Sequence, residues 1–462
     1  MALNDELFQY PQELKTRLDE TCDLEFKDGS RVTSDEIWRF MTEEGPRRYP
    51  NLFSNSRYYG LSKDTDLVSG IKRNYFTITL YDRLTNASQN GVPIIFIQGG
   101  QTHEPYYAAG GIPTRPGMVN GWATNLKENM DYQEADFRRL QIREIGRQEL
   151  TVEACQTAKY EIIQQGMVPM ALIAPYLCLR CSDIAYGVEA HRHGDIKIPL
   201  LMVDFPVNRQ SDKGYSIEYV ADNLRRLTEK IGELRNRKVT DEDIRNEIKL
   251  HNQKRKLARD YVNLWWSAST PPTNSEDHTG IMQLGNESNG DPVAAKQVLK
   301  ESYDEVKERV KNSVKGEGIE DDPVRLFICG SCVNPNPKLV DSLGGVVAGK
   351  DDGWSEISVD VEETGDPYEK LAKAIVSFPY ELPTEERGQW TSEQVRKSKA
   401  DGLIFMHQWG CNFQSAVARM VADVVKEDTG IPCITIERAM AESQMGHEQL
   451  HSRVEIFIEM LK

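Results

Sequence analysis

Apolar segments of strand length alternate with amphipathic helical segments in the C-terminal part of the chain. Residues 402–406 form a short apolar run, residues 416–425 carry apolar side chains at helical spacing, and residues 431–436 form a second apolar run. Gly430 supplies a helix stop signal between the helical segment and the second run. This pattern predicts a strand, a loop, a helix and a strand. The loop is expected at the carboxyl end of a parallel sheet, where open α/β sheets bind their ligands.

The same order of patterns occurs earlier in the chain. Residues 167–174 form an apolar run, Cys178 and Cys181 follow it, and residues 198–205 form the next apolar run. We therefore expect two doubly wound, flavodoxin- or Rossmann-like lobes with parallel sheets, each placing a cysteine after an interior strand.

Helical patterns dominate between the two lobes. Residues 216–264 are almost continuously helical in pattern, with a new helix capped by Thr240 or Asp241. A strand at residues 75–80 is expected to open the first lobe, and residues 92–97 are expected to form the next strand. The predicted organisation is an N-terminal helical extension (1–70), a first α/β lobe (71–235), a helical connecting region (236–320) and a second α/β lobe (321–462).

Composition places the chain among ordinary soluble proteins. Its 462 residues exceed what one hydrophobic core usually serves, so two or three domains are expected. It is 39% hydrophobic and 28% charged, and no apolar run approaches the roughly 18 residues that a membrane span needs. The first residues are acidic and lack the apolar core of a secretory signal. We therefore expect a cytoplasmic protein without a membrane segment.

The formal net charge of −16 disfavours nucleic acid as a partner, because binding to phosphates requires a basic face. The lysine-rich residues 252–256 lie within a helical pattern that also contains many acids. We interpret this run as an exposed helix face.

Eight cysteines without a secretory signal favour thiol, metal or redox chemistry over disulfides. The pairs Cys178/Cys181 and Cys329/Cys332 allow a four-thiolate zinc site, which is disfavoured because the pairs fall in different predicted lobes. Cys411 with His407 allows a nucleophile and a base, although no carboxylate partner is evident nearby.

A third alternative is an iron–sulfur cluster held by three thiolates from the two lobes. Cys155 falls in the first turns of a helix that Thr151 would cap, where the helix dipole stabilises a thiolate. Cys155 would be one of the three ligands, together with Cys181 and Cys411. Spacing alone does not decide among these alternatives.

Taken together, several segments resemble the 2-hydroxyacyl-CoA dehydratases and the related ATP-dependent benzoyl-CoA reductases. The resemblance covers roughly residues 92–462, and its order and spacing are more specific than any single piece. The segments are Glu-Pro-Tyr-Tyr-Ala-Ala-Gly-Gly-Ile-Pro (104–113), Glu-Ala-Cys (153–155), Cys181 before Ile-Pro (198–199), Gly-Ser-Cys-Val-Asn-Pro-Asn-Pro-Lys (330–338), Ala-Asp-Gly-Leu-Ile (400–404), Gly-Cys-Asn (410–412), Gly-Ile-Pro (430–432) and the terminal residues 453–461.

The resemblance implies one [4Fe–4S] cluster held by Cys155, Cys181 and Cys411, with Cys178 as an alternative to Cys181. Some relatives bind a double-cubane cluster through additional cysteines. The matching stretches here, residues 349–353 and 386–390, contain no cysteine, so a single cubane is expected.

The resemblance also implies an oxygen-sensitive acyl-CoA enzyme with a homologous second subunit. A separate ATP-hydrolysing iron–sulfur activator would supply a low-potential electron, since this chain has no P-loop. In the dehydratases the electron generates a ketyl radical anion before the hydroxyl group leaves; in the reductases an aromatic ring is reduced.

Dehydration is the leading expectation, and a non-catalytic electron-transfer subunit is a further alternative. His103, His407 and Trp409 are candidate substrate contacts on loops near the predicted cluster. Local packing or a backbone hydrogen bond is the simpler explanation for each of the three.

Overall fold

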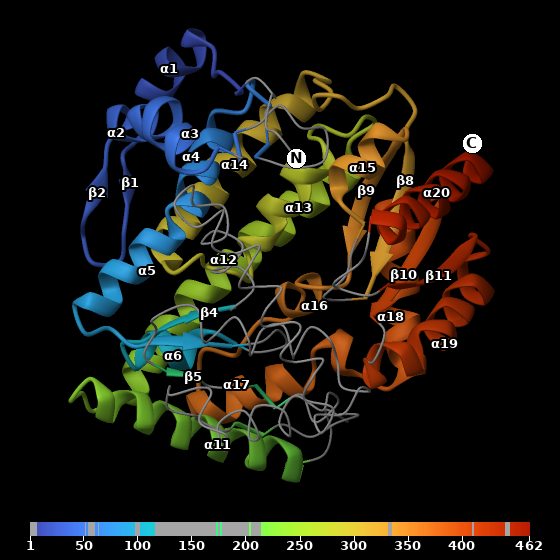
Figure 1. Cartoon of the computed structure of the whole chain (residues 1–462). Helices are drawn as coiled ribbons and strands as arrows, with labels where there is room; N and C mark the ends of the chain where they lie inside the picture. The colour runs from blue at the N-terminus through green and yellow to red at the C-terminus, as the bar shows by residue number, and fades with distance from the viewer. Residues whose placement is uncertain are drawn as a thin grey trace.

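The protein is a mixed α/β structure (Figure 1). The computed structural model describes residues 7–50, 52–53, 61–62, 64–97, 102–115, 214–330, 335–408, 411–438 and 444–462, together with short strand segments at 172–173, 176–177 and 203–204. The predicted α/β class with parallel strands is confirmed. Two complete doubly wound lobes, and the predicted division into four segments, stay predictions.

A four-stranded sheet organises the C-terminal part. Its strands are β8 (Val324–Cys329), β9 (Gly345–Lys350), β10 (Gly402–Gln408) and β11 (Cys433–Arg438). All neighbours are parallel, in the order β11-β10-β8-β9. From β8 the chain moves outward to β9 and then returns to β10 on the other side of β8. The strand order therefore reverses between β8 and β10, and such a switch point is the usual ligand site of an open parallel sheet.

Helices cover both faces of this sheet (Figure 1). The helices are α15 (Pro337–Ser342), α18 (Thr384–Ser398), α19 (Asn412–Thr429) and α20 (Gln444–Leu461). Phe327 and Phe405 pack in the cluster that includes α18 and α19. Leu326 and Ile404 pack in the cluster that includes α15 and α20. Adjacent strand residues thus point to opposite faces, and both faces are apolar, as expected for a buried parallel sheet.

The first predicted lobe contains short parallel strands. In one sheet β3 (Ile94–Phe96) lies between β4 (Ile112–Thr114) and β5 (Leu172–Ile173), and in another β6 (Tyr176–Leu177) pairs with β7 (Val203–Asp204). β3, β5 and β7 lie within the apolar runs predicted as strands, which confirms those runs.

The strand predicted at residues 75–80 is wrong, because α4 (Val68–Ile78) and α5 (Leu80–Gln89) occupy that stretch. Alternating Phe76, Ile78 and Leu80 resembled a strand, but these side chains are buried by helix packing, which overrides local propensity.

The middle and N-terminal segments form a largely helical body. The middle helices are α11 (Gly214–Leu234), α12 (Asp241–Ser267), α13 (Ser275–Gln283) and α14 (Pro292–Lys311). The N-terminal elements are α1 (Gln12–Asp19), a hairpin of β1 (Leu24–Glu25) and β2 (Arg31–Val32), α2 (Ser34–Arg39), a π-helix (Phe40–Glu44) and α3 (Gly45–Arg48). The predicted cap at Thr240 is confirmed by a capping box with Asp243. Leu18, Phe76, Trp265 and Val298 belong to one hydrophobic cluster. The described residues before residue 102, called the N-terminal segment below, are therefore part of this body.

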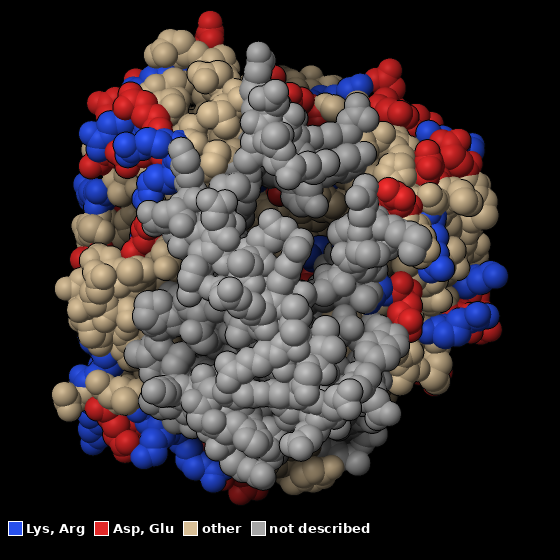
Figure 2. Space-filling view, viewed as in Figure 1, with Lys and Arg blue, Asp and Glu red and all other residues tan. Residues whose placement is uncertain are grey.

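Short helices complete the described structure: α6 (Glu104–Ala108), α16 (Trp354–Ile357), α17 (Pro367–Val376) and a 3-10 turn (Pro379–Glu381). No helix among the described residues is long and apolar enough to cross a membrane. On the face shown in Figure 2, basic and acidic side chains alternate around the margin.

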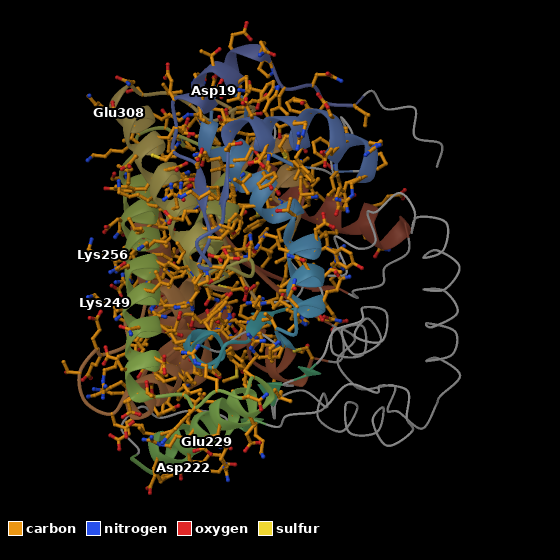
Figure 3. The ribbon with its side chains drawn as sticks, turned by 90° about the vertical axis from the view of Figure 1, so that its left-hand side faces the viewer. Asp19, Asp222, Glu229, Lys249, Lys256 and Glu308 are labelled. Carbon is orange, nitrogen blue, oxygen red and sulfur yellow. The ribbon has the colours of Figure 1, made fainter. Side chains whose placement is uncertain are left out.

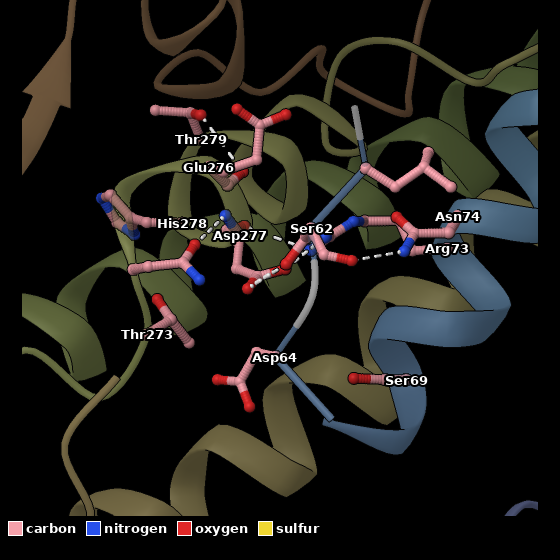
Figure 4. Close-up of polar contacts among 12 residues, drawn as sticks. Ser62, Asp64, Ser69, Arg73, Asn74, Thr273, Glu276, Asp277, His278 and Thr279 are labelled. Atoms are coloured by element: carbon pink, nitrogen blue, oxygen red, sulfur yellow. Dashed lines mark hydrogen bonds and ion pairs between the residues drawn. The ribbon is translucent and has the colours of Figure 1, made fainter. Parts of the chain in front are cut away.

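A buried polar network ties the N-terminal segment to α13 and α14 (Figure 4). Arg73 of α4 pairs with Asp277 of α13, both being largely buried. Ser62 donates to the same carboxylate at 2.5 Å, and Arg309 holds Asp64 through bonds of 2.7 and 2.9 Å. Removing one partner of such a buried pair is costly, because the other charge is left unpaired. The network therefore specifies how the N-terminal segment docks.

His278, next to Asp277, gives a pH prediction. Its ring stacks on Trp265 with centroids 4.1 Å apart, and burial lowers its pKa from 6.5 to about 3. Below pH 6.5 the unfolded chain takes up a proton that the folded chain does not. Unfolding free energy should therefore fall as the pH drops from 6.5 toward 3, by up to ~1.4 kcal/mol per pH unit for this group. Unfolding free energies from urea titrations should depend less steeply on pH in His278→Gln than in the parent between pH 6.5 and 4.

The matched control is His451→Gln on α20, whose side chain is 35% exposed. Its unfolding free energy should depend on pH as steeply as that of the parent. Equal slopes in the parent and His278→Gln would contradict the assignment of this pH dependence to His278.

Candidate functional site at the carboxyl edges of the sheets

The carboxyl end of β8 is shaped by a glycine. Gly330 follows the strand with φ +100°, and a Cβ atom there would lie 1.8 Å from the carbonyl oxygen of Met406 on β10. No other residue fits this conformation and this approach. Gly330 therefore fixes the chain direction at the switch point between β8 and β10.

Cys411 lies at the adjacent end of β10. Its side chain is buried, and it occupies the N-cap position of the 18-residue helix α19. Its backbone N–H donates to the carbonyl of Gln408 at 3.0 Å. The unpaired N–H groups and the dipole at a helix N-terminus favour a thiolate. This environment fits a metal-ligating cysteine.

The other described cysteines lie in different environments. Cys329 packs inside the apolar cluster beneath α18 and α19, and burial raises the pKa of its thiol well above the usual value. Burial also raises the pKa of Cys433 to about 11. Cys22 is exposed on the N-terminal segment. A four-thiolate zinc site that used Cys329 is therefore disfavoured.

The remaining predicted ligands, Cys155, Cys181 and the alternative Cys178, lie outside the described residues. Within the described ranges no group of three His, Cys, Asp or Glu side chains is arranged to hold a metal ion. The three-cysteine set stays a prediction.

A fully buried ion pair supports this edge. Asp351, directly after β9, accepts the Gly330 N–H at 2.9 Å and pairs with Arg387 of α18. Arg387 also donates to the amide oxygen of Gln414 at 3.2 Å, in the first turn of α19. The pair thus joins the ends of β8 and β9 to the beginning of the helix that Cys411 caps. Sequence reasoning missed both residues; the signal available was an acidic side chain directly after an apolar run.

His407 lies in β10 itself, because the strand extends to Gln408; its expected position on a loop is wrong. Its Nδ1 is hydrogen-bonded to Ser415 Oγ at 3.1 Å and lies 4.0 Å from Glu437. Burial lowers its pKa. Trp409 lies outside the described residues. His407 is thus bonded to a side-chain hydroxyl of α19, whereas the simpler explanation was local packing or a backbone hydrogen bond.

The third predicted contact, His103, lies after β3 at the N-cap position of α6. Its ring is buried, its Nδ1 has no hydrogen-bond partner among the described residues, and burial lowers its pKa to about 4. The next residue, Glu104, is fully buried and accepts from Arg255 of α12 at 2.8 Å, while its second oxygen has no partner among the described residues. The first sheet therefore also carries buried polar side chains at its carboxyl edge.

These side chains meet a buried polar face of α12. Glu247, His251, Lys254 and Arg255 are all buried on this helix. The interpretation of residues 252–256 as an exposed face is therefore wrong for Lys254 and Arg255. It holds for Lys256, which points outward in Figure 3 and is 70% exposed. Spacings of three and four residues place the buried group on one side of the helix, a periodicity that the sequence did contain.

Lys254 is an unusual member of this face. Its Nζ donates to Ser288 Oγ at 2.6 Å, and burial lowers its pKa to about 7. Lys254 can therefore exchange a proton near neutral pH, and the neutral imidazole of His103 can accept a hydrogen bond. Together with Glu104 these groups could bind and orient a polar ligand.

α12 also connects the two edges. Its Arg259 donates to the carbonyl of Ile357 at 2.7 Å. Ile357 ends α16, which closely follows β9 and Asp351. Arg255 and Arg259 are one turn apart, so the same helix contacts the polar groups after β3 and the segment after β9.

Sequence comparisons find similarity to subunits of acyl-CoA dehydratases and reductases. A family model described as "2-hydroxyglutaryl-CoA dehydratase, D-component" matches residues 102–461. A benzoyl-CoA reductase subunit from Thauera aromatica is 30% identical over 254 residues, which is 52% of this chain and 62% of that protein. The match thus spans less than two thirds of that relative.

Two further relatives are more distant. The putative dehydratase subunit YjiM from Escherichia coli (strain K12) is 25% identical over 296 residues, 61% of this chain and 74% of that protein. The (R)-phenyllactyl-CoA dehydratase beta subunit from Clostridium sporogenes is 24% identical over 281 residues, 57% of this chain and 68% of that protein.

The geometry at Gly330 can be tested by stability. Gly330→Ala should lower the unfolding free energy by about 3 kcal/mol or more, because the added methyl group meets a backbone oxygen at a left-handed residue. Gly318→Ala is the matched control: its φ is +75° but no atom lies within 4 Å of an added Cβ. It should cost only the conformational strain, about 1–2 kcal/mol. Equal losses in denaturant titrations would show that the contact with Met406 contributes nothing.

Proposed function

Because the chain belongs to the 2-hydroxyglutaryl-CoA dehydratase D-component family, we propose that it is the iron–sulfur subunit of an oxygen-sensitive acyl-CoA enzyme of the 2-hydroxyacyl-CoA dehydratase type. The observation that carries the proposal is the family match, which extends over residues 102–461. The buried Cys411 at the N-terminus of α19, at a sheet switch point, supports the same proposal.

The proposed ligands of a [4Fe–4S] cluster are Cys155, Cys181 and Cys411, with Cys178 as the alternative to Cys181. When bound, the cluster would supply low-potential one-electron chemistry and an iron that can accept a substrate oxygen. Asp351 and Arg387 would keep the Cys411 turn in place through Gly330 and Gln414. Both side chains of this ion pair are buried.

Substrate binding is proposed at the carboxyl edge of β3. Arg255 holds Glu104 in one orientation, and the second oxygen of Glu104 and Nδ1 of His103 are buried without a hydrogen-bond partner among the described residues. The net dehydration would remove the C2 hydroxyl and a C3 proton as water, leave a 2,3-enoyl thioester and return the initiating electron. His103, His407 and Trp409 stay candidate substrate contacts.

Partners are part of the proposal. The relatives named above are subunits, which supports a homologous second subunit for this chain. We also propose a separate ATP-hydrolysing iron–sulfur activator as the electron source, in the cytoplasm.

Reduction of an aromatic ring is the second candidate function. It is favoured by the 30% identity to a benzoyl-CoA reductase subunit, against 24% to a dehydratase beta subunit. The two reactions give different products from different thioesters, a 2,3-enoyl-CoA in one case and a ring-reduced acyl-CoA in the other.

Anaerobically purified protein should contain about four iron and four acid-labile sulfide per chain. Cys155→Ser, Cys181→Ser and Cys411→Ser should each lose most of both, because each removes a proposed ligand. Cys433→Ser is the control, since Cys433 lies part-buried at the start of β11 and donates to a local carbonyl. It should retain the parental content. Zinc without sulfide would reject the cluster.

Adding acyl-CoA separates catalytic from purely electron-carrying roles. A catalytic subunit should show a saturable change in the cluster's electron paramagnetic resonance spectrum with a 2-hydroxyacyl-CoA or with benzoyl-CoA, whichever is the substrate. An intact cluster whose spectrum responds to neither would support the non-catalytic electron-transfer alternative.

A further inference from the structure

A cavity of 830 Å³ lies beside the buried polar face of α12, with Glu247 in its wall. The hairpin of β1 and β2, α5, the end of α6, the beginning of α12 and Gly290–Asp291 form its walls. Its volume is in the range of small-molecule sites. Neither Cys411 nor His103 lines it.

The cavity combines two parts of the chain. Lys27 and Arg83 come from the segment before residue 102, outside the matched family region, whereas Tyr107 and Glu247 lie inside it. Lys27 reaches across to pair with Glu247 and lies over the Tyr107 ring, 5.3 Å from its centroid. The cavity therefore depends on how the N-terminal segment docks, and the family's shared region alone does not form it.

Four of the seven charged side chains in the wall form ion pairs with each other. Lys27 pairs with Glu247, and Arg237 pairs with Asp243 at 2.5 Å. Asp291 caps α14 and accepts the Lys27 N–H at 2.9 Å. Arg83 has no carboxylate within 4.0 Å among the described residues, so its charge lacks a direct counter-ion.

The Arg83 guanidinium lies over the rings of Phe76 and Phe26, 4.5 and 5.5 Å from their centroids, and its hydrogen bonds use only part of the group. Nη2 donates to the carbonyls of Phe76 and Asn289 at 2.7 and 2.8 Å, and Nε lies 3.4 Å from Thr79 Oγ1. Nη1 has no partner among the described residues and lies beside Gly290, which adds no side chain in front of it. Burial lowers the pKa of Arg83 to about 10, so the group stays charged at neutral pH.

We propose that this cavity binds a small monocarboxylate with an apolar body, whose carboxylate accepts hydrogen bonds from Nη1 of Arg83. Apolar wall residues are available for the body, among them Val32, Val92 and Ile112. The wall holds four acidic side chains against three basic ones, which disfavours polyanions such as coenzyme A. Arg83 is the one basic side chain of this wall without an ion pair among the described residues, and it offers a site for a single carboxylate.

Such an occupant would bridge the N-terminal segment and α6. Tyr107 and Ala108 at the end of α6 line the cavity, and Glu104 at its beginning pairs with Arg255. Binding would therefore stabilise the docked N-terminal segment at one end of α6 while the candidate substrate groups lie at the other.

Calorimetry on the full-length, anaerobically purified protein tests the proposal. Hexanoate should bind saturably to the parent, and hexanamide, which lacks the charge, should bind more weakly. Arg83→Gln should weaken hexanoate binding by about tenfold or more, the loss expected for a hydrogen bond to a charged group. Arg237→Gln is the matched control, since Arg237 lines the same cavity but already pairs with Asp243. It should bind hexanoate within about twofold of the parent.

Absence of saturable hexanoate binding, equal affinity in Arg83→Gln, or displacement of hexanoate by coenzyme A would overturn the proposal. Arg83 also supports local structure, so a second measurement uses the parent protein alone. Hexanoate should protect Arg83 from modification by phenylglyoxal, followed by peptide mass spectrometry. Unchanged modification at saturating hexanoate would equally reject the site.

Discussion

The burial of charged side chains along α12 is the constraint on which much of the structure depends. An isolated charge in a protein interior is very unfavourable, so each such group requires a partner. Glu247 pairs with Lys27 of the N-terminal hairpin, Lys254 bonds to Ser288, and Arg255 holds Glu104. These partners lie before α12, after it, and at the edge of the first sheet. One helix therefore requires three distant segments to converge.

The second sheet uses the same principle in a smaller space. Asp351 and Arg387 are fully buried and pair with each other, and they also bind the Gly330 N–H and Gln414. Such networks add little net stability, but they penalise any other arrangement. The ion pair thus links Gly330 at the end of β8 to Gln414 in the first turn of the helix that Cys411 caps.

Local sequence patterns predicted the positions of strands and helix caps more reliably than they predicted which side chains are buried. The apolar runs became β3, β5, β7, β10 and β11, and the Thr240 cap was correct, because strand hydrophobicity and capping act within a few residues. The alternation of Phe76, Ile78 and Leu80 led to the wrong prediction of a strand, because a buried helix can also bury such residues. The helical spacing of Lys254 and Arg255 was present in the sequence, but their partners lie 34 and 151 residues away, so the spacing alone did not show that this side is buried. Similarity to a known family indicated Cys411 and the segment containing Glu104, whereas the Arg387 pair depends on tertiary contacts alone.

The packing of the N-terminal segment also affects which part of the chain can fold by itself. Sequence similarity to the family begins at residue 102, but Leu18, Phe53 and Phe76 share a hydrophobic cluster with Trp265 and Val298. A shortened chain beginning at residue 102 would expose the apolar faces of α12 and α14 and leave Asp277 without Arg73. The alignment boundary is therefore not a place at which this protein can be divided. Its N-terminal residues cover apolar surface of α12 and α14, so the family-matched region alone is expected to expose that surface and to aggregate.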